Sequence, residues 1–286
     1  MTASHKSLKR KREITAGQDI GAVLGLFGGY VGKPLRVDLS KHTITEEKLK
    51  QHLLRKFIGG SSLAAKILFD DTGVETNPLS PENVLVFMTG PVAATKVPLS
   101  GRYQVASKSP LTGLIGESDS GGSWGPELKK AGYDGILITV QAREPVYLWV
   151  CNGHAELKSA EHLWGVDTYE IDRLIQDETD RKAVTACIGP AGERLARIAS
   201  IMNDGKHGRA AARCGLGAVM GAKRLKAIAV RGTGTVEVAH SEELNASVRT
   251  LASSIVEKVK NMHDYGTSSG MATIEYLGDL PIRNWL

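Results

Sequence analysis

Cysteine is scarce in this chain of 286 residues, which contains only Cys151, Cys187 and Cys214, far apart along the sequence. No C-x-x-C pair occurs, so local spacing provides neither a zinc site nor the ligand set of an iron–sulfur cluster. An odd and sparse number of cysteines is typical of a reducing compartment. We therefore expect a cytoplasmic protein.

Long apolar runs are also missing, and no stretch is long enough to cross a bilayer, so we predict no membrane-spanning helix. The segment IGAVLGLFGGY at residues 20–30 follows a basic cluster and faintly resembles a secretory signal. A polar stretch separates the two, however, and no small-residue cleavage site is evident. The sequence therefore gives no reason to revise the cytoplasmic prediction.

Most of the excess of basic over acidic residues lies at one end of the chain. The formal net charge is +5, but residues 1–33 hold six lysines and arginines against two acidic residues, which is +4 and leaves about +1 for the rest. Basic tails of this kind are usually solvated or disordered. We expect residues 1–31 to form a disordered extension, and we expect no nucleic-acid partner.

Glycine, in contrast, is abundant, and residues 202–226 form the richest stretch. Arg209 and Arg213 stand among these glycines, four positions apart, and would share a face if the segment were helical. Guanidinium groups beside exposed backbone N–H groups suit phosphate or another oxyanion. The alternative is a tightly packed helix of small residues with both arginines solvated.

Apolar alternation and turn residues predict an α+β arrangement up to about residue 236. We predict a helix at 46–56, a second at 61–70 capped by Ser61 or Ser62, a short helix with Pro126 in its first turn, and one opened by Asp167 and Glu170. Residues 117–122 are interpreted as a glycine-rich loop whose helix could receive an anion. The predicted strands are residues 35–39, 43–45, 84–88, 103–107, 135–140, 146–150, 183–188 and 227–231.

The pattern changes near residues 236–241, where we place a domain boundary. From there, apolar residues recur at helical spacing: Leu244, Val248, Leu251, Ile255 and Val259. A helical segment of about 45 residues is small for independent stability. We interpret 32–238 as one domain and 239–286 as the start of a truncated helical domain with exposed apolar surface.

Several motifs follow one another in order, and together they resemble the N-terminal half of aldehyde ferredoxin oxidoreductases, from about Gly32 onward. They are GRY at 101–103, SPLTG at 109–113, DSGG at 119–122, GPELKKAGYDGI from 125, IGPAGE at 188–193, MNDG at 202–205 and GRAAARCGLGAVMG from 208. The resemblance implies an α+β fold in which two mixed β-sheets with flanking helices form the base for a tungsten or molybdenum bis-pterin cofactor.

Matching these motifs residue by residue implies which positions contact the pterins. They are Arg102, Asp119, Gly121, Arg209, Ala210, Ala212 and Arg213. The resemblance also implies that main-chain oxygens at Asp119 and Ala210 help hold a magnesium ion joining the two cofactor phosphates. Family members usually have Asn where Asp119 stands, so a backbone contact there would be preserved and a side-chain amide donor would be lost. Cys214 stands at a usual glycine position and is interpreted as a small buried thiol.

The implied activity is oxidation of an aldehyde with water to a carboxylate, with electrons passing through a [4Fe–4S] cluster to ferredoxin. Family members are about twice this length, and their C-x-x-C-x-x-x-C ligand group lies beyond the point that Leu286 matches. The expected protein partners are therefore a missing C-terminal half or a second copy of the chain in a homodimer. No residue is assigned as catalytic, because His162, His207 and His240 are isolated in the sequence.

Two other functions stay open at this point. One is a non-catalytic truncated product or subunit that binds pterin or docks to a partner. The other is a nucleotide- or phosphate-binding module that rests on the glycine loops alone. The latter lacks both the P-loop pattern and a strand–G-x-G-x-x-G–helix order.

Overall fold

The computed structural model describes residues 28–285. The described residues divide into two compact units, 28–95 with Ser100–Ala239 and Lys96–Leu99 with 240–285. Most of the predicted basic extension, residues 1–27, lies outside the described residues. Residues 28–31 belong to the first unit, where the backbone N–H of Gly29 donates to the carbonyl oxygen of Glu237 at 2.6 Å.

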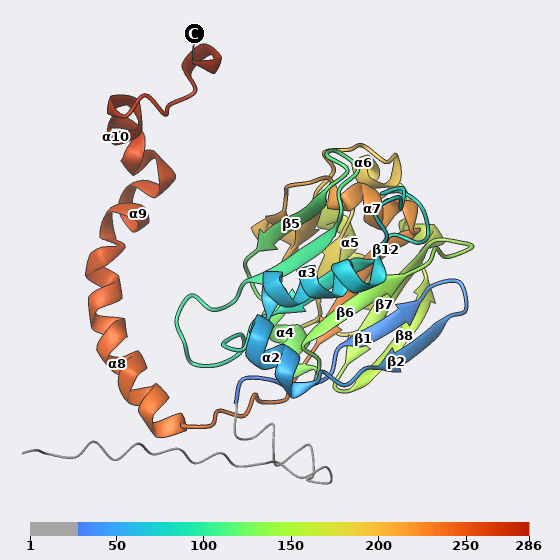
Figure 1. The fold of residues 1–286 in the computed structure, drawn as a ribbon, viewed down its shortest axis with the longest axis horizontal. Helices are drawn as coiled ribbons and strands as arrows, with labels where there is room; N and C mark the ends of the chain where they lie inside the picture. Colours follow the sequence, from blue (N-terminus) through green and yellow to red (C-terminus); the bar gives the residue numbers. More distant parts are fainter. Residues whose placement is uncertain (1–27, 286) are drawn as a thin grey trace, which may run out of the picture. The chain divides into compact units, whose positions relative to one another are not determined.

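The first unit contains two six-stranded mixed sheets (Figure 1). The first sheet has the order β2-β1-β6-β3-β4-β5, and the second has the order β11-β10-β9-β12-β7-β8. The strands of the first are β1 (Leu35–Asp38), β2 (Thr43–Glu46), β3 (Leu85–Thr89), β4 (Tyr103–Lys108), β5 (Ile115–Ser120) and β6 (Gly135–Thr139). Those of the second are β7 (Val146–Cys151), β8 (His154–Ser159), β9 (Val184–Cys187), β10 (Ile201–Asn203), β11 (Arg209–Ala211) and β12 (Leu225–Arg231).

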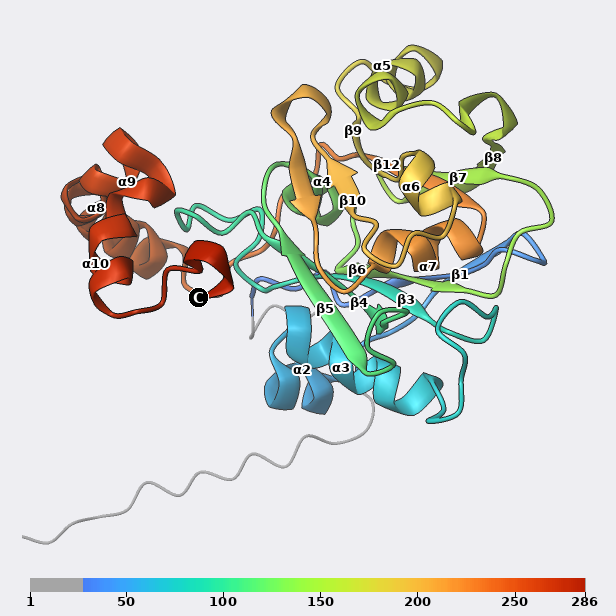
Figure 2. The same cartoon turned by 90° about the horizontal axis from the view of Figure 1, so that it is seen from above.

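The helices of the first unit cover and separate these sheets (Figure 2). Helices α2 (Gln51–Phe57) and α3 (Gly60–Asp71) pack on the outer face of the first sheet, and α5 (Thr168–Glu178) packs on the outer face of the second. The two inner faces share one core with α4 (Trp124–Lys130) and α7 (Leu216–Ala222).

Strand periodicity explains why the central strands are apolar throughout. In β3, Phe87 belongs to the inner core while Val86 and Met88 pack beneath α3. In β7, Leu148 lies in the inner core while Tyr147 and Trp149 pack against α5. Both faces of these strands are buried, so a continuous apolar run satisfies them. The α+β prediction of two mixed sheets with flanking helices is confirmed.

Three local predictions are wrong. The helix predicted at 46–56 begins only at Gln51, because Glu46 still pairs with Leu35 in the β1–β2 hairpin. Neither Ser61 nor Ser62 caps α3, whose N-cap is Gly59; the Ser61 hydroxyl donates instead to Glu117 at 2.6 Å. Residues 117–122 are not simply a loop, because most of them belong to β5. Their polar sequence concealed a strand that buries only alternate residues.

The second unit is helical. It comprises α8 (Ser241–Lys258), α9 (Lys260–Tyr265) and α10 (Met271–Tyr276). None of these helices contains a buried residue, and apolar side chains such as Val256, Tyr265 and Leu277 are largely exposed. Within residues 28–285 we find no helix with both the length and the apolar character needed to cross a membrane.

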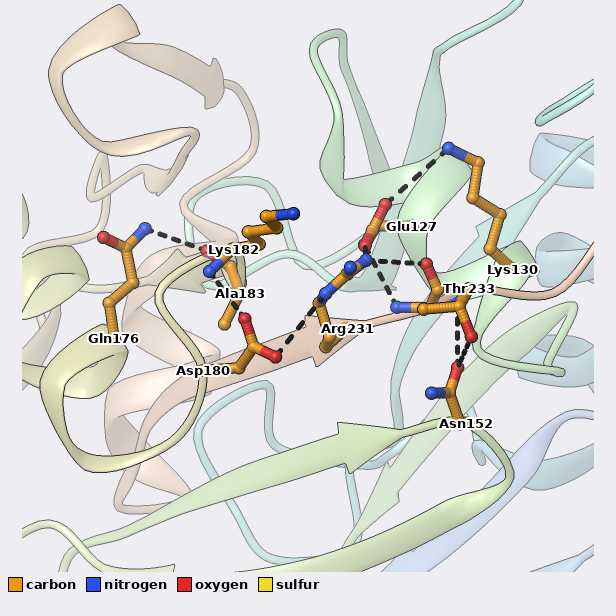
Figure 3. A network of polar contacts seen from close by, with 10 residues as sticks. Glu127, Lys130, Asn152, Gln176, Asp180, Lys182, Ala183, Arg231 and Thr233 are labelled. Atoms are coloured by element: carbon orange, nitrogen blue, oxygen red, sulfur yellow. Dashed lines mark hydrogen bonds and ion pairs between the residues drawn. The ribbon is translucent and has the colours of Figure 1, made fainter.

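Several buried or half-buried cations of the first unit are paired with carboxylates. Lys129 Nζ lies 2.9 Å from Asp134 Oδ1 with both side chains almost fully buried, and Lys226 pairs with Glu193 in the same way. At the end of β12, Arg231 Nη1 lies 2.6 Å from Glu127 Oε1, linking the strand to α4 (Figure 3). These carboxylates compensate cations that have lost their hydration.

Candidate functional site

Strands β5 and β11 form the two rims of a seam between the sheets. Each is the last strand of its own sheet, and the two strands lie against each other. An end strand has one edge whose backbone N–H and C=O groups no neighbouring strand pairs. The seam therefore presents main-chain donors and acceptors from both sheets, and all the sequence-predicted site residues lie along it.

The first rim brings together three of the predicted residues. In the β4–β5 pair, Tyr103 is opposite Ser120 and Gln104 is opposite Asp119. One position beyond the Tyr103–Ser120 pair, the same register places Arg102 beside Gly121. Arg102 is exposed, and a Cβ added to Gly121 meets no atom within 4 Å, so the space over this glycine is open.

The second rim carries the other four predicted residues. In the β10–β11 pair, Asn203 is opposite Arg209 and Met202 is opposite Ala210. Ala212 and Arg213 follow β11 and are exposed. Arg209 and Arg213 do not share a helix, so the condition for a common helical face is not met. Arg209–Ala211 is a strand, and α7 begins only at Leu216.

A direct hydrogen bond connects the two rims near their middle. The backbone N–H of Arg213 donates to Ser118 Oγ at 3.1 Å. Cys214 supports the same joint, since its thiol donates to the Glu117 carbonyl at 3.5 Å and its own carbonyl accepts from Ser109 Oγ at 2.8 Å. Residues distant in sequence are thus held together here by polar contacts.

The three seam arginines have no carboxylate partner within the described part of the chain. No ion pair between residues 28 and 285 involves Arg102, Arg209 or Arg213, whereas Arg36, Arg173 and Arg231 each have two. Exposed guanidinium groups without counter-charges favour an external anion, and bidentate contacts with phosphate suit them best.

Asp119 contributes its backbone to the seam, and its carboxylate points elsewhere. Gln104 Nε2 donates to Asp119 Oδ1 at 2.8 Å, and neighbouring Glu117 contacts Ser61 on α3. The buried side chains of Ser118 and Ser120, in contrast, face the second sheet. A cation held between β5 and β11 would therefore meet the main chain of Asp119, which fits the backbone form of the predicted magnesium contact.

Asn203 and Asp204 are the seam residues that sequence reasoning missed. Asn203 is 1% exposed and contacts Tyr103, Ser120 and Gly121 on the opposite rim. Asp204 has φ 61°, in the left-handed region, and Oδ2 accepts from the Ser123 backbone N–H at 2.6 Å. The Asp204-Gly205 pair is a turn signal that could have drawn attention to this corner.

A pocket of about 390 Å³ opens beside this corner, between α5 and the 3-10 turn Gly205–His207. Asp172 and Asp204 both line it. Burial raises the pKa of Asp172, and the nearby Asp204 carboxylate adds to the rise. Asp172 is already engaged by the Thr185 hydroxyl at 2.6 Å and by Gln176 at 3.2 Å, so its role here is structural.

Metal ligation by side chains has no candidate in the described residues. No group of three or more His, Cys, Asp or Glu side chains between residues 28 and 285 is arranged to hold a metal ion. Cys151, Cys187 and Cys214 are free, and burial raises the pKa of the Cys187 thiol to about 12.

Known proteins resemble this chain over most of its length. Residues 34–232 match the family described as aldehyde ferredoxin oxidoreductase, N-terminal domain. The tungsten-containing aldehyde ferredoxin oxidoreductase of Pyrococcus furiosus is 41% identical over 268 residues, which is 91% of this chain and 43% of the relative. The aliphatic sulfonate oxidoreductase WOR-like subunit of the same organism is 33% identical, over 90% of this chain and 43% of the relative.

A solved structure shares the fold. The active-site complex BamBC of benzoyl coenzyme A reductase, in complex with 1,5-dienoyl-CoA, superposes with a TM-score of 0.71 at 39% identity, covering 73% of this chain and 32% of that chain. These matches relate the fold of this chain, two mixed sheets with flanking helices, to known oxidoreductases. More narrowly, the chain belongs to the aldehyde ferredoxin oxidoreductase family, and it spans 43% of the length of its tungsten-containing relatives.

Proposed function

We propose that this chain is the N-terminal part of an aldehyde:ferredoxin oxidoreductase-like enzyme and that the seam binds a tungsten or molybdenum bis-pterin cofactor. The observation that carries the proposal is the set of three guanidinium groups, Arg102, Arg209 and Arg213, which have no carboxylate partner among residues 28–285 and come from both sheets. A cofactor with two phosphates supplies the anions that these groups lack.

The small side chains of the seam also support the proposal. Open space above Gly121, together with the small side chains of Ala210 and Ala212, would let a ligand approach the backbone. Backbone oxygens of Asp119 and Ala210 would hold a magnesium ion between the two phosphates. The role of these residues is binding, orientation and charge compensation.

When bound, the metal–pterin group supplies the two-electron oxidation of an aldehyde and water to a carboxylate. Electrons would leave through a [4Fe–4S] cluster to ferredoxin in the complete enzyme. The cysteines of the described residues do not provide that cluster's ligands. We therefore expect little or no aldehyde-dependent viologen reduction from the 286-residue chain by itself.

A second candidate is a non-catalytic subunit that binds pterin and docks to a partner. The exposed apolar side chains of α8–α10 favour it, among them Leu251, Val256, Met262, Tyr276 and Leu277. Such a subunit would show no aldehyde oxidation even together with its partner. If aldehyde-dependent viologen reduction appears when the C-terminal half of a family enzyme is supplied, the chain is part of an enzyme and not a non-catalytic subunit.

The cofactor itself is tested by composition. The chain is produced in a host that makes tungstopterin, purified without oxygen, and assayed for pterin by fluorescence after oxidation and for metal by mass spectrometry. We expect pterin and tungsten or molybdenum to copurify with the folded chain. A folded chain free of pterin, with no uptake when the cofactor is added, would contradict the proposal.

A further inference from the structure

The amide of Asn203 uses all of its hydrogen-bonding capacity inside the seam. Oδ1 accepts from the Tyr103 hydroxyl at 3.1 Å and also from the Ser120 hydroxyl. Nδ2 donates to the Gly121 carbonyl at 3.0 Å and to Asp204 Oδ1 at 2.9 Å. Two accepted and two donated bonds saturate a side-chain amide, which is what a fully buried Asn requires.

The partners also fix which way the amide points. The Gly121 carbonyl and the Asp204 carboxylate can only accept hydrogen bonds, so the NH₂ group has to face them. The two hydroxyls can donate and therefore face the amide oxygen. No rotation of this side chain by 180° would keep the four bonds, and neither an isosteric carboxylate nor an apolar residue could make all of them.

Asn203 stands between predicted cofactor contacts of both rims. On its own sheet it is the direct cross-strand partner of Arg209. Cross-strand partners project to the same face of a sheet, so Arg209 lies on the side where Asn203 meets the first sheet. Across the seam, Asn203 binds the carbonyl of Gly121, which the strand register places beside Arg102.

Asp204 tightens the same connection. It accepts from the Ser123 backbone N–H, and a Cβ added to Gly122 would lie only 2.1 Å from Asp204 Oδ2. Gly122 has φ +90°, so only a glycine fits both the space and the backbone conformation. The turn after β5 is therefore held closely against the end of β10.

We propose that Asn203, assisted by Asp204, is the positioning residue that fixes the spacing of the two seam rims, so that one phosphate-bearing ligand is held by arginines of both sheets at once. The proposal rests on the proposed pterin-binding function. A neutral amide is needed because a second carboxylate beside Asp204 would repel it and would face the Gly121 carbonyl without a donor. Residues that orient ligand-binding groups change affinity by about 10- to 100-fold when altered.

The test compares Asn203→Asp with a matched control, Asn83→Asp. Asn83 is also fully buried; it donates to the carbonyls of Pro78 and Lys108 at 2.6 and 3.0 Å and accepts from the Lys108 backbone. It therefore holds the Lys108 end of β4, next to the Ser109–Cys214 contact, whereas Asn203 contacts the other end of the strand at Tyr103. Both changes replace a buried amide that donates two hydrogen bonds by a carboxylate that can donate none.

Two readouts separate positioning from general stability. Hydrogen exchange of the backbone amides at residues 121–123 and 209–212 should accelerate about tenfold or more in Asn203→Asp and stay unchanged in Asn83→Asp. Pterin retained per folded chain should fall about 10- to 100-fold in Asn203→Asp only. Ser120→Ala, which removes a single hydroxyl donor, should accelerate exchange at the same amides to a smaller extent. This variant replaces Asn203→Asp in the test if Asn203→Asp does not fold.

Equal exchange at these amides in the two Asn variants, or equal pterin retention while the wild type holds pterin, would overturn the assignment of Asn203. A wild-type chain without pterin would instead contradict the proposed function. The exchange comparison needs no cofactor, so it still decides whether Asn203 holds the rims together.

Discussion

Two buried lysines in the core of the first unit have carboxylate partners, whereas three arginines of the seam have none within the described residues. In the core, Lys129 and Lys226 are almost fully buried and each lies against a carboxylate. At the seam, Arg102, Arg209 and Arg213 are exposed and no ion pair within residues 28–285 involves them. Carboxylates are thus used where a cation supports the fold and are missing where a cation could serve a ligand.

The comparison is informative because arginines at a protein surface easily find acidic neighbours. Arg173, on α5, contacts both Glu170 and Asp177 at 3.2 Å. The acidic residues nearest the seam bind neutral groups instead: Asp119 binds Gln104, and Asp204 binds backbone and side-chain amides. The positive charge of the three arginines would attract phosphate groups, and this attraction would be screened by salt.

Breaking a core pair should have the largest effect. Asp134→Ala leaves the Lys129 ammonium buried with only the carbonyls of Gly29 and Gly90 as partners. We expect the free energy of unfolding to fall by about 3–5 kcal/mol, measured by urea denaturation. Arg173→Ala is the control and should cost less than about 1 kcal/mol, because its pairs are exposed. Similar losses for both variants would contradict the contrast between buried and exposed pairs.

Lys223 is an exception within the core and gives a pH-dependent prediction. Its Nζ donates to the carbonyls of Pro81 and Val140 at 3.1 and 3.0 Å, and burial lowers its pKa to about 8. Between about pH 8 and 10.5 the folded state has lost this proton while the unfolded state still binds it, so stability rises with pH in that window.

The matched variant is Lys223→Met, which keeps the length of the side chain but cannot titrate. Across pH 8 to 10.5, the stability of the wild type relative to Lys223→Met should rise by about 3 kcal/mol, from urea titrations at both ends of the window. Subtracting the stability of Lys223→Met from that of the wild type cancels the contributions of tyrosines and cysteines that titrate in the same pH range. Parallel pH profiles for the two proteins would show that Lys223 keeps an ordinary pKa.

Removing a seam arginine should change binding and leave the fold intact. Arg209→Ala and Arg213→Ala should each weaken pterin retention by about 1.5–3 kcal/mol, the range for hydrogen bonds to charged groups. Their free energies of unfolding should stay within about 0.5 kcal/mol of the wild type, because exposed side chains without a partner contribute little. A large loss of stability would mean that these arginines support the fold, as the core cations do.

The smallest expected effect concerns a carboxylate that serves backbone N–H groups. Asp167 caps α5 by accepting from the backbones of Tyr169 and Glu170 at 2.9 and 3.1 Å. Asp167→Ala should reduce the free energy of unfolding by about 1 kcal/mol, as usual for an N-cap, and Asp167→Asn should restore most of it. Thermal unfolding measures both, and a loss as large as that of Asp134→Ala would place Asp167 in the core's charge network instead.

Sequence patterns of a few residues predicted those helices and strands that depend on interactions between neighbouring residues. The apolar strands were predicted because both faces are buried, and the Asp167 cap was predicted from its spacing to Glu170. Strands β5, β8, β10 and β11 were missed. A polar end strand such as IGESDS has no apolar stripe to reveal it, and β10 and β11 are only three residues long.

The candidate site also has a part that the local sequence predicted and a part that it did not. Its arginines and glycines were found from motifs, but the role of Asn203 depends on partners 82, 83 and 100 positions away in sequence. Neither propensity nor periodicity contains such pairings. Only the meeting of two sheets at β5 and β11 creates them.

The most direct test of the account is pterin content in the wild type and in a triple variant, Arg102→Ala with Arg209→Ala and Arg213→Ala, produced side by side in a host that makes tungstopterin. Circular dichroism should show the same fold in both proteins. We predict that the wild type retains pterin and that the triple variant retains almost none. Equal pterin in the two proteins would contradict the claim that the unpaired arginines of the seam hold the cofactor.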